Sequence, residues 1–247
     1  MAPKIEVCDL SMSYGSYVVM RNVSFAVQRG EIFLIVGRSG CGKSTLLRHL
    51  LGLRRIGRRK VLYDGRDINQ EISGGDFYGK KIGVLYQSGA LWSSMTLAEN
   101  VALPLEMHTA MEQDEIDEIV SLKLALVGLR GFGDFYPSEV SGGMKKRAGL
   151  ARAMALDPEI LFFDEPSAGL DPVSARRLDD LILELRDSLG ITIVAVTHEL
   201  ASIFAIGTRM VYLDAESKTA TAVGAPGELL ETSKDKNVVA FLSRGET

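Results

Sequence analysis

One short stretch constrains this chain more than any other. Residues 37–45 read Gly-Arg-Ser-Gly-Cys-Gly-Lys-Ser-Thr, so that Gly37 and Gly42 frame a loop that is followed directly by Lys43 and Ser44. The preceding run, Ile32–Val36, is unbroken and apolar, which is typical of a strand buried on both faces. Downstream, leucines recur at helical spacing as far as Gly52. The stretch is therefore expected to connect a buried strand to the N-terminus of a helix.

Such a connection favours the binding of an anion. Free backbone N–H groups and the helix dipole attract negative charge, and glycines let the backbone wrap closely around phosphate oxygens. Lys43 supplies a positive charge, and the hydroxyl of Ser44 can ligate Mg²⁺. A chance glycine-rich turn is the alternative, but a spurious match has odds on the order of one per cent at ordinary residue frequencies. We interpret the stretch as a nucleoside-triphosphate site. Its binding residues are Gly37, Arg38, Ser39, Gly40, Cys41, Gly42, Lys43, Ser44 and Thr45.

The composition is that of an ordinary globular protein, with 46% hydrophobic and 24% charged residues. The 247 residues suffice for one substantial α/β domain. No apolar run reaches the roughly 18 residues of a membrane-spanning helix, and the start of the chain lacks the features of a secretion signal. The net charge of −4 argues against a nucleic-acid scaffold.

One basic cluster and two cysteines have less specific interpretations. The cluster, which consists of Arg54, Arg55, Arg58, Arg59 and Lys60, is expected on a solvated loop, with a contact to lipid headgroups or a partner as the alternative. Two cysteines give no disulfide framework. Cys8 is expected in a strand, and Cys41 is expected to be a small loop residue rather than an oxidation-sensitive thiol.

Apolar periodicity predicts the remaining elements. Residues 4–13 and 18–27 are expected to form an antiparallel pair around a turn at Tyr14, whose ring could stack on a purine. Further strands are predicted at 60–63, 82–86, 160–165, 191–196, 210–213 and 219–223. Helices are predicted from Thr96 to a point before Pro104, over 116–127 and 145–156, after Asp171-Pro172, and within 226–243.

These elements indicate an α/β fold with a phosphate-loop core, an antiparallel β subdomain and a helical subdomain. We expect one domain. Residues 1–88 and 158–225 would form the nucleotide-binding core with its β subdomain, residues 89–157 the helical subdomain, and residues 226–247 a helical tail.

Polar side chains follow the predicted core strands. Asp164 ends an apolar strand and is expected to hold Mg²⁺, while Glu165 is placed to accept a proton from an attacking water. A pair of plain surface carboxylates is the alternative, which the four apolar residues before them disfavour. Gln87 could orient that water or touch the metal, and His198 could donate a hydrogen bond to the γ-phosphate, although a lone histidine is more often structural.

A second anion site is predicted where Ser141-Gly142-Gly143 opens a helix. Exposed N–H groups, a hydroxyl and the absence of side chains suit an anion, whereas a plain helix cap is the simpler interpretation. Because the chain already has one phosphate cradle in residues 37–45, the second makes sense if two copies face each other and each donates it to the nucleotide of the other.

The ordered motifs resemble those of ABC-type ATPase subunits over nearly the whole chain. The matching segments are residues 37–45, Gln87, Val140–Met144, Ile160–Glu165, Ala168–Asp171 and His198. The resemblance implies a P-loop NTPase (RecA-like) core and a head-to-tail homodimer with ATP and Mg²⁺ at its interface. ATP hydrolysis would drive a multi-pass membrane permease from the cytoplasmic face of the inner membrane.

The resemblance also implies a role for each residue at the site. Lys43, Ser44 and Thr45 would bind phosphates and Mg²⁺, with Gln87 and Asp164 also at the metal, and Ser141, Gly142 and Gly143 of the second copy would clamp the γ-phosphate. Glu165 would be the general base, His198 the γ-phosphate switch and Tyr14 the adenine platform. Asp171 would act across the dimer interface, and Gln87 would sense nucleotide and contact the coupling helix of the permease. Met144 stands where Gln is usual in the signature, which leaves the backbone cradle intact.

Finer features resemble the ATPases of Mla/Mce-type lipid transport systems. They are Gln87–Leu91, Glu99–Val101 with Pro104-Leu105, Ser141–Met144 and Pro166–Asp171; Glu199 departs from the Asp common in that group. In such systems the ATPase pairs with a permease and a lipid-binding Mce protein, and the cargo is phospholipid or a related lipid.

Other interpretations fit less well. Soluble ABC-type ATPases that act on DNA or ribosomes usually carry a long coiled-coil insertion or paired ATPase units, and this chain shows neither. A kinase on the phosphate-loop fold would lack the Ser-Gly-Gly cradle and would need an acceptor site. An ABC ATPase that serves a non-lipid solute also remains open.

Overall fold

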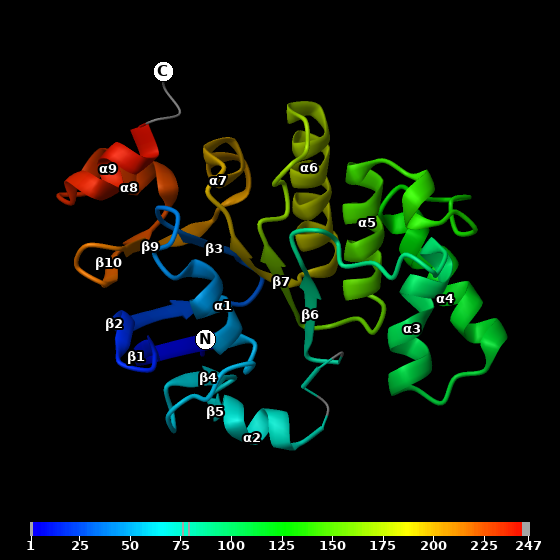
Figure 1. The fold of residues 1–247 in the computed structure, drawn as a ribbon, viewed down its shortest axis with the longest axis horizontal. Helices are drawn as coiled ribbons and strands as arrows, with labels where there is room; N and C mark the ends of the chain where they lie inside the picture. The colour runs from blue at the N-terminus through cyan, green and yellow to red at the C-terminus, as the bar shows by residue number, and fades with distance from the viewer. Residues whose placement is uncertain (1, 76, 79, 244–247) are drawn as a thin grey trace.

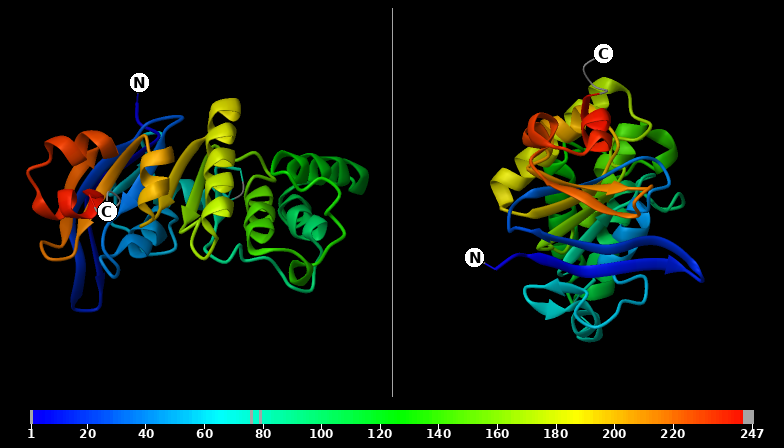
Figure 2. Two further views of the ribbon diagram at one scale, coloured as in Figure 1. Left: turned by 90° about the horizontal axis from the view of Figure 1, so that it is seen from above. Right: turned by 90° about the vertical axis from the view of Figure 1, so that its left-hand side faces the viewer.

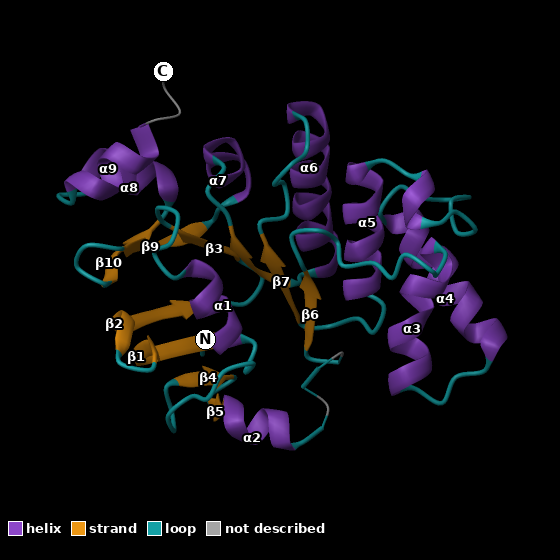
Figure 3. Ribbon diagram, in the orientation of Figure 1, coloured by secondary structure: helices purple, strands orange, loops and turns teal. Residues whose placement is uncertain are grey.

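The chain builds two sheets around a shared helix, with a helical segment at one end (Figures 1 and 3). The computed structural model describes residues 2–75, 77–78 and 80–243. Figure 2 shows an elongated molecule, with the helices of residues 97–153 at one end and the C-terminal helices at the other. The expected α/β class is confirmed, while the exact residue ranges of the subdomains stay a prediction.

The smaller sheet holds the N-terminal hairpin. Its strands are β1 (Ile5–Tyr14), β2 (Tyr17–Val27), β4 (Val61–Tyr63) and β5 (Arg66–Asp67), in the antiparallel order β2-β1-β4-β5. Tyr14 pairs with Tyr17 across a tight turn, which confirms the predicted strand pair.

The larger sheet carries the parallel core. Its order is β10-β9-β3-β8-β7-β6, in which β10 alone is antiparallel to its neighbour. The strands are β3 (Ile32–Val36), β6 (Ile82–Leu85), β7 (Ile160–Asp164), β8 (Thr192–Val196), β9 (Arg209–Asp214) and β10 (Thr219–Gly224). Every residue of β3 is buried, as its apolar run predicts.

The helix α1 (Lys43–Leu50) packs between the two sheets. Its leucines belong to the same buried cluster as Phe25 of the small sheet and Phe33 of the large sheet. Those two rings stack with their centres 5.1 Å apart. The large sheet therefore holds the start of α1 firmly at the carboxyl end of β3.

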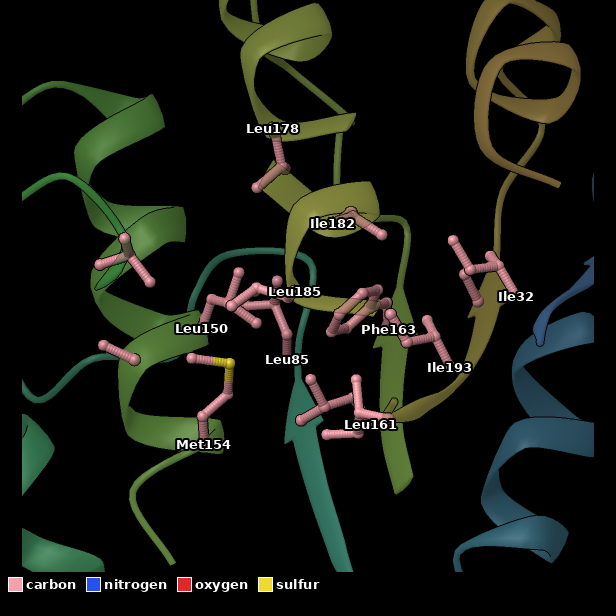
Figure 4. Close-up of a cluster of buried hydrophobic side chains, with 14 of the residues drawn as sticks. Ile32, Leu85, Leu150, Met154, Leu161, Phe163, Leu178, Ile182, Leu185 and Ile193 are labelled. Carbon is pink, nitrogen blue, oxygen red and sulfur yellow. The ribbon is translucent and has the colours of Figure 1, made fainter. Parts of the chain in front are cut away.

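The opposite face of the large sheet is covered by α6 (Pro172–Leu189) and α7 (Leu200–Ile206). Figure 4 shows Leu178, Ile182 and Leu185 of α6 lining the buried cluster that also contains Phe163 and Ile193 of the sheet. Asp171 caps α6 and Pro172 begins it, which confirms the predicted helix start.

The helical segment contains α3 (Leu97–His108), α4 (Gln113–Leu126), a short 3₁₀ turn (Pro137–Glu139) and α5 (Gly142–Ala153). The predicted end of α3 before Pro104 is wrong, because the helix continues through that proline. A capping box at Thr96 fixes the start of α3, and Val101 and Leu105 are buried on both sides of Pro104. Their burial offsets the backbone hydrogen bond that proline cannot donate.

Helix α5 also differs from its predicted span of 145–156. The hydroxyl of Ser141 accepts a hydrogen bond from the backbone N–H of Met144 and caps the helix, so that Gly142 and Gly143 already lie in the first turn. At the other end, Met154 leaves helical geometry with φ −96° and ψ 0°, and the helix stops at Ala153.

Three short elements were not predicted from the sequence, whereas the helices of the tail were. The helices α2 (Ile68–Ser73) and α7 and the strand β5 are too short to show a clear period. The expected tail helices are confirmed as α8 (Pro226–Thr232) and α9 (Lys236–Leu242). In the described part of the chain, no helix combines the length and apolar character that a bilayer span requires.

A close backbone approach joins the helical segment to the sheet and generates a stability prediction. A Cβ on Gly83 of β6 would lie 2.0 Å from the carbonyl oxygen of Ala153 in α5. We expect Gly83→Ala to lower the free energy of unfolding by about 2 kcal/mol or more, because backbone must move to admit the methyl group. Urea unfolding of the full chain measures this change.

Gly227→Ala is the matched control. Gly227 lies in α8 with nothing within 4 Å of its Cβ position, so that alanine should leave stability unchanged or raise it by about 0.5 kcal/mol. Equal unfolding midpoints for the two variants would contradict the packing argument.

Candidate active site

The predicted site residues converge on one edge of the parallel sheet. Neighbouring strands β3, β8, β7 and β6 end there, and the loops that follow them carry the polar side chains. One hollow of about 440 Å³ is lined by Tyr14, Tyr17, Val19, Ser39, Gly40, Gly42, Lys43, Ser44, Thr45, Gln87, Asp164, Glu165 and His198. A hollow of about 650 Å³ adjoins it and is lined by Gly37, Arg38, Ser39, Lys43, Glu165, His198, Leu200 and Phe241. The two hollows thus share Ser39, Lys43, Glu165 and His198.

The glycine loop has the geometry of an anion cradle. Gly42 is the N-cap of α1 and has a φ of 104°, a conformation that favours glycine. Because glycine has no side chain, none covers the free N–H groups at the start of the helix. A Cβ on Gly37 would lie 2.5 Å from the carbonyl oxygen of Leu213, which leaves room only for glycine. The ammonium group of Lys43 is buried and donates to the carbonyl oxygens of Gly37 at 2.8 Å and Arg38 at 3.2 Å.

Cys41 points into the core rather than toward the loop surface. It is 2% exposed and belongs to the cluster around α1. Burial raises the pKa of its thiol, which disfavours the reactive thiolate. This environment supports the interpretation of Cys41 as a small loop residue.

The oxygen groups around Asp164 suit Mg²⁺. Burial, reinforced by the charge of Glu165, raises the pKa of Asp164. A cation bound beside it would act in the opposite direction, because positive charge favours the ionised carboxylate. Ser44 and Gln87 line the same hollow and add a hydroxyl and an amide oxygen. No cluster of three or more His, Cys, Asp or Glu side chains able to hold a metal occurs in residues 2–75, 77–78 and 80–243. Mg²⁺ fits such a sparse set, because it keeps water ligands and shares substrate phosphates.

Glu165 leaves the strand in an unusual conformation. Its φ is 52°, in the left-handed region, and its backbone N–H donates to the carbonyl oxygen of Val196 at 2.9 Å. Its Oε2 atom is buried without a hydrogen-bond partner, although Nδ1 of His198 lies only 2.8 Å away. The carboxylate thus lies beside the imidazole in the polar hollow, where it could accept a proton from a bound water.

Two tyrosines stand at the tip of the first hairpin. The hydroxyl of Tyr14 lies 3.5 Å from Oγ1 of Thr45, and the guanidinium of Arg54 lies 4.7 Å from the centre of its ring. Tyr17 lines the same hollow, with Nζ of Lys218 4.6 Å from its ring centre. Tyr17 was not among the predicted site residues, although the register of the predicted hairpin could have revealed it, because Tyr17 is the cross-strand partner of Tyr14.

The second predicted cradle lies apart from both hollows. Ser141, Gly142 and Gly143 open α5, and Asp171 opens α6 by accepting hydrogen bonds from Val173 and Ser174 at 3.0 Å. A Cβ on Gly142 or Gly143 would make only ordinary contacts, at 3.8 Å and 3.6 Å. Packing within the chain therefore does not require glycine at either position, and the structure does not bring this cradle to its own phosphate loop.

Comparisons with known proteins agree with this geometry. A family model described as ABC transporter matches residues 20–168. The chain is 42% identical over 245 residues to the "Probable ribonucleotide transport ATP-binding protein mkl" of Mycobacterium tuberculosis, covering 98% of this chain and 67% of that protein. It is 40% identical over 245 residues to the "Intermembrane phospholipid transport system ATP-binding protein MlaF" of Haemophilus influenzae, covering 98% and 91%.

A solved structure adds the oligomeric arrangement of a similar protein. It is the dimeric post-hydrolysis state of an ATP-binding cassette bound to ADP and Pi, and it superposes with a TM-score of 0.78 at 27% identity, covering 90% of this chain and 98% of that one.

Removing the ammonium group of Lys43 tests the cradle. We expect Lys43→Ala to weaken ATP binding by about tenfold or more, because a buried charge-assisted contact to phosphate is lost. Titration with a fluorescent ATP analogue measures the dissociation constant. Lys234→Ala, which removes an exposed charge in the tail, is the control and should bind ATP like the wild type. Equal affinities for both variants would show that Lys43 does not contact the nucleotide.

Proposed function

This chain belongs to the ABC transporter family, and we propose that it is the ATP-hydrolysing subunit of a transporter for phospholipid or a related lipid. The observation that carries the proposal is the convergence of four strand-end loops on one phosphate cradle, in a chain 40% identical to a phospholipid-transport ATPase. The likeness to a cassette bound to ADP and Pi supports ATP as the nucleotide.

The side chains of the hollow suit distinct steps of hydrolysis. Lys43 and the N–H groups at the start of α1 bind and orient the phosphates, and Tyr14 stacks on the adenine. Ser44, Asp164 and Gln87 would hold Mg²⁺, which neutralises phosphate charge when bound. Oε2 of Glu165 accepts the proton of the attacking water, and His198 donates to the γ-phosphate.

The separate cradle supports a head-to-tail dimer. Ser141 and Gly142 are exposed at the start of α5, where the free N–H groups and the helix dipole favour an anion. Because they line neither of the two hollows of their own chain, they would close over the γ-phosphate held by a second copy. Asp171, at the start of α6, would lie at the same interface.

A groove beside Gln87 supports a membrane permease as the partner. The hollow, of about 260 Å³, is lined by Tyr78, Ile82, Gly83, Val84, Tyr86, Pro104, His108, Arg152, Ala153 and Leu156. It lies between β6 and the helices α3 and α5, so that any motion of the helical segment changes its shape. Tyr78 and Tyr86 expose 39% and 40% of their surface and could receive a coupling helix.

The membrane setting follows from that partner. The ATPase would sit at the cytoplasmic face of the inner membrane, and an Mce-type lipid-binding protein would belong to the same complex. The match to MlaF supports a lipid cargo. The relative named for ribonucleotide transport supports a second candidate cargo, the ribonucleotides.

Purification of the intact complex tests the cargo. The tagged chain, extracted from native membranes into a mild detergent, should retain a multi-pass permease, an Mce-type protein and bound phospholipid detectable by mass spectrometry. Glu165→Gln, which should trap the ATP-bound dimer, serves to stabilise the complex. A permease that carries ribonucleotide or another solute would overturn the lipid assignment, and ribosomes or DNA in place of a permease would overturn transport itself.

Blocking the exposed cradle tests the dimer. We expect Ser141→Arg to lower ATPase turnover by about 100-fold, because the bulky side chain fills the place of the partner's γ-phosphate. Binding of ATP to the monomer should stay within about threefold of the wild type, since Ser141 lies outside that hollow. Ser138→Arg, in the preceding 3₁₀ turn, is the control for added charge. Full turnover in Ser141→Arg would contradict a cradle that acts between subunits.

A further inference from the structure

We propose that Lys146 is a positioning residue. Within each subunit it connects the catalytic loop to the helix that the same subunit presents to the ATP of its partner. The catalytic loop is the segment Glu165–Ala168, and the helix is α5. This inference rests on the proposed dimeric ATPase and adds a physical link between its sites.

Lys146 holds the catalytic loop by its backbone. Its ammonium group donates to the carbonyl oxygens of Pro166 at 2.5 Å, Ala168 at 2.6 Å and Glu165 at 3.4 Å. An ammonium group has three N–H donors, and the loop offers three acceptors in a cluster. A single side chain from a different element thus fixes the path of nearly the whole loop.

The position of this charge is costly, which argues against a merely incidental contact. Lys146 is 5% exposed, and burial lowers the pKa of its ammonium group, opposed by the carboxylates of Glu199 and Glu165. Among the ion pairs of the described residues, none includes Lys146. A buried cation bonded only to neutral carbonyls is more expensive than an apolar side chain of the same length.

The catalytic loop depends on an external tie. Glu165 adopts a left-handed conformation, and its carbonyl oxygen accepts from the N–H of Ala168 at 3.2 Å as well as from Lys146. Its Oε2 makes no hydrogen bond, and Nδ1 of His198 lies 2.8 Å from it. Because the carboxylate is carried by the backbone of Glu165, a shift of that backbone also shifts the carboxylate relative to His198.

Helix α5, which carries Lys146, begins at the proposed subunit interface. Lys146 is the fifth residue of α5, about 7 Å along the helix from its N-cap, Ser141. The first turn of α5 also lies close to Leu170, which follows the same loop, and to the start of α6. A Cβ on Gly142 would meet Leu170 at 3.8 Å, and one on Gly143 would meet Ser174 at 3.6 Å.

These contacts give the link a direction. When the γ-phosphate of the partner's ATP docks on the start of α5, any shift of that rigid first turn carries Lys146 and, with it, the carbonyl oxygens of the catalytic loop. The position of Glu165 in one subunit then depends on whether the partner's γ-phosphate occupies the cradle at the start of α5 of that same subunit. Coupling of this kind predicts that hydrolysis depends cooperatively on ATP.

Kinetics of the full chain test the proposal. Lys146→Met keeps the length and removes the donors, so that kcat should fall about tenfold or more while KM for ATP stays within about threefold. Dimer formation with ATP, followed by light scattering, should persist, as in Glu165→Gln. The Hill coefficient for ATP should fall toward one. Lys146→Arg, which still donates to carbonyl oxygens, should recover most of kcat.

Arg147→Met is the matched control. Arg147 is the next residue of α5 and donates to the carbonyl oxygens of Val127 at 3.0 Å and Gly128 at 3.1 Å, in a loop of the helical segment. Its loss should lower the thermal stability of the chain and leave kcat within about twofold of the wild type.

The outcomes separate the proposals. Unchanged kcat in Lys146→Met, or equal losses of kcat in Lys146→Met and Arg147→Met, would overturn the positioning role. A rise of KM with unaltered kcat would also overturn it, because Lys146 would then serve binding. A wild-type chain that hydrolyses no ATP would instead overturn the proposed function, and the positioning role with it.

Discussion

The structure depends on the free N–H groups at the start of α1. They attract an anion only if the strand and the helix on either side are held still, and the buried strand β3 with the cluster around α1 supplies that rigidity. The parallel order of β3, β8, β7 and β6 then brings the other strand ends to the same edge. The side chains that we propose to act in catalysis come from distant parts of the chain, and the strand order brings them together at the phosphate loop.

Much of this arrangement could be predicted because it follows from local patterns. Two patterns each predict both a strand and the position of the polar residue that follows it. One is an apolar strand next to a glycine loop, and the other is an apolar strand that ends in carboxylates. Pro104 shows the limit, since burial of Val101 and Leu105 overrides the local preference to end the helix. Tyr17 could have been found only by extending the predicted hairpin to its register, because it is the cross-strand partner of Tyr14. Lys146 could not be found from local patterns, because its role depends on a contact between α5 and the loop after β7.

The hollows within one chain do not include the second anion cradle. The phosphate loop, Asp164 and Glu165 line one hollow, whereas Ser141, Gly142 and Gly143 at the start of α5 line neither of the two hollows. On the proposed function, such a chain would hold ATP alone and would need a second copy to hydrolyse it. Closure of the dimer would then be a step that a permease can use, and the groove between β6 and α3 would receive the motion.

Several destabilising features are concentrated in the loop after β7. In the described part of the chain, three buried side-chain oxygens have no hydrogen-bond partner, and two of them belong to Glu165 and Ser167. Glu165 also has a left-handed backbone, and the charge of Lys146 is buried against the same loop. Each such feature lowers the stability of the folded chain by on the order of 1 to 3 kcal/mol. A sequence selected only for stability would not keep them. We infer from their concentration beside the phosphate loop that the loop is shaped for a site that holds nucleotide, in which water, phosphate and a second copy of the chain would supply the missing contacts.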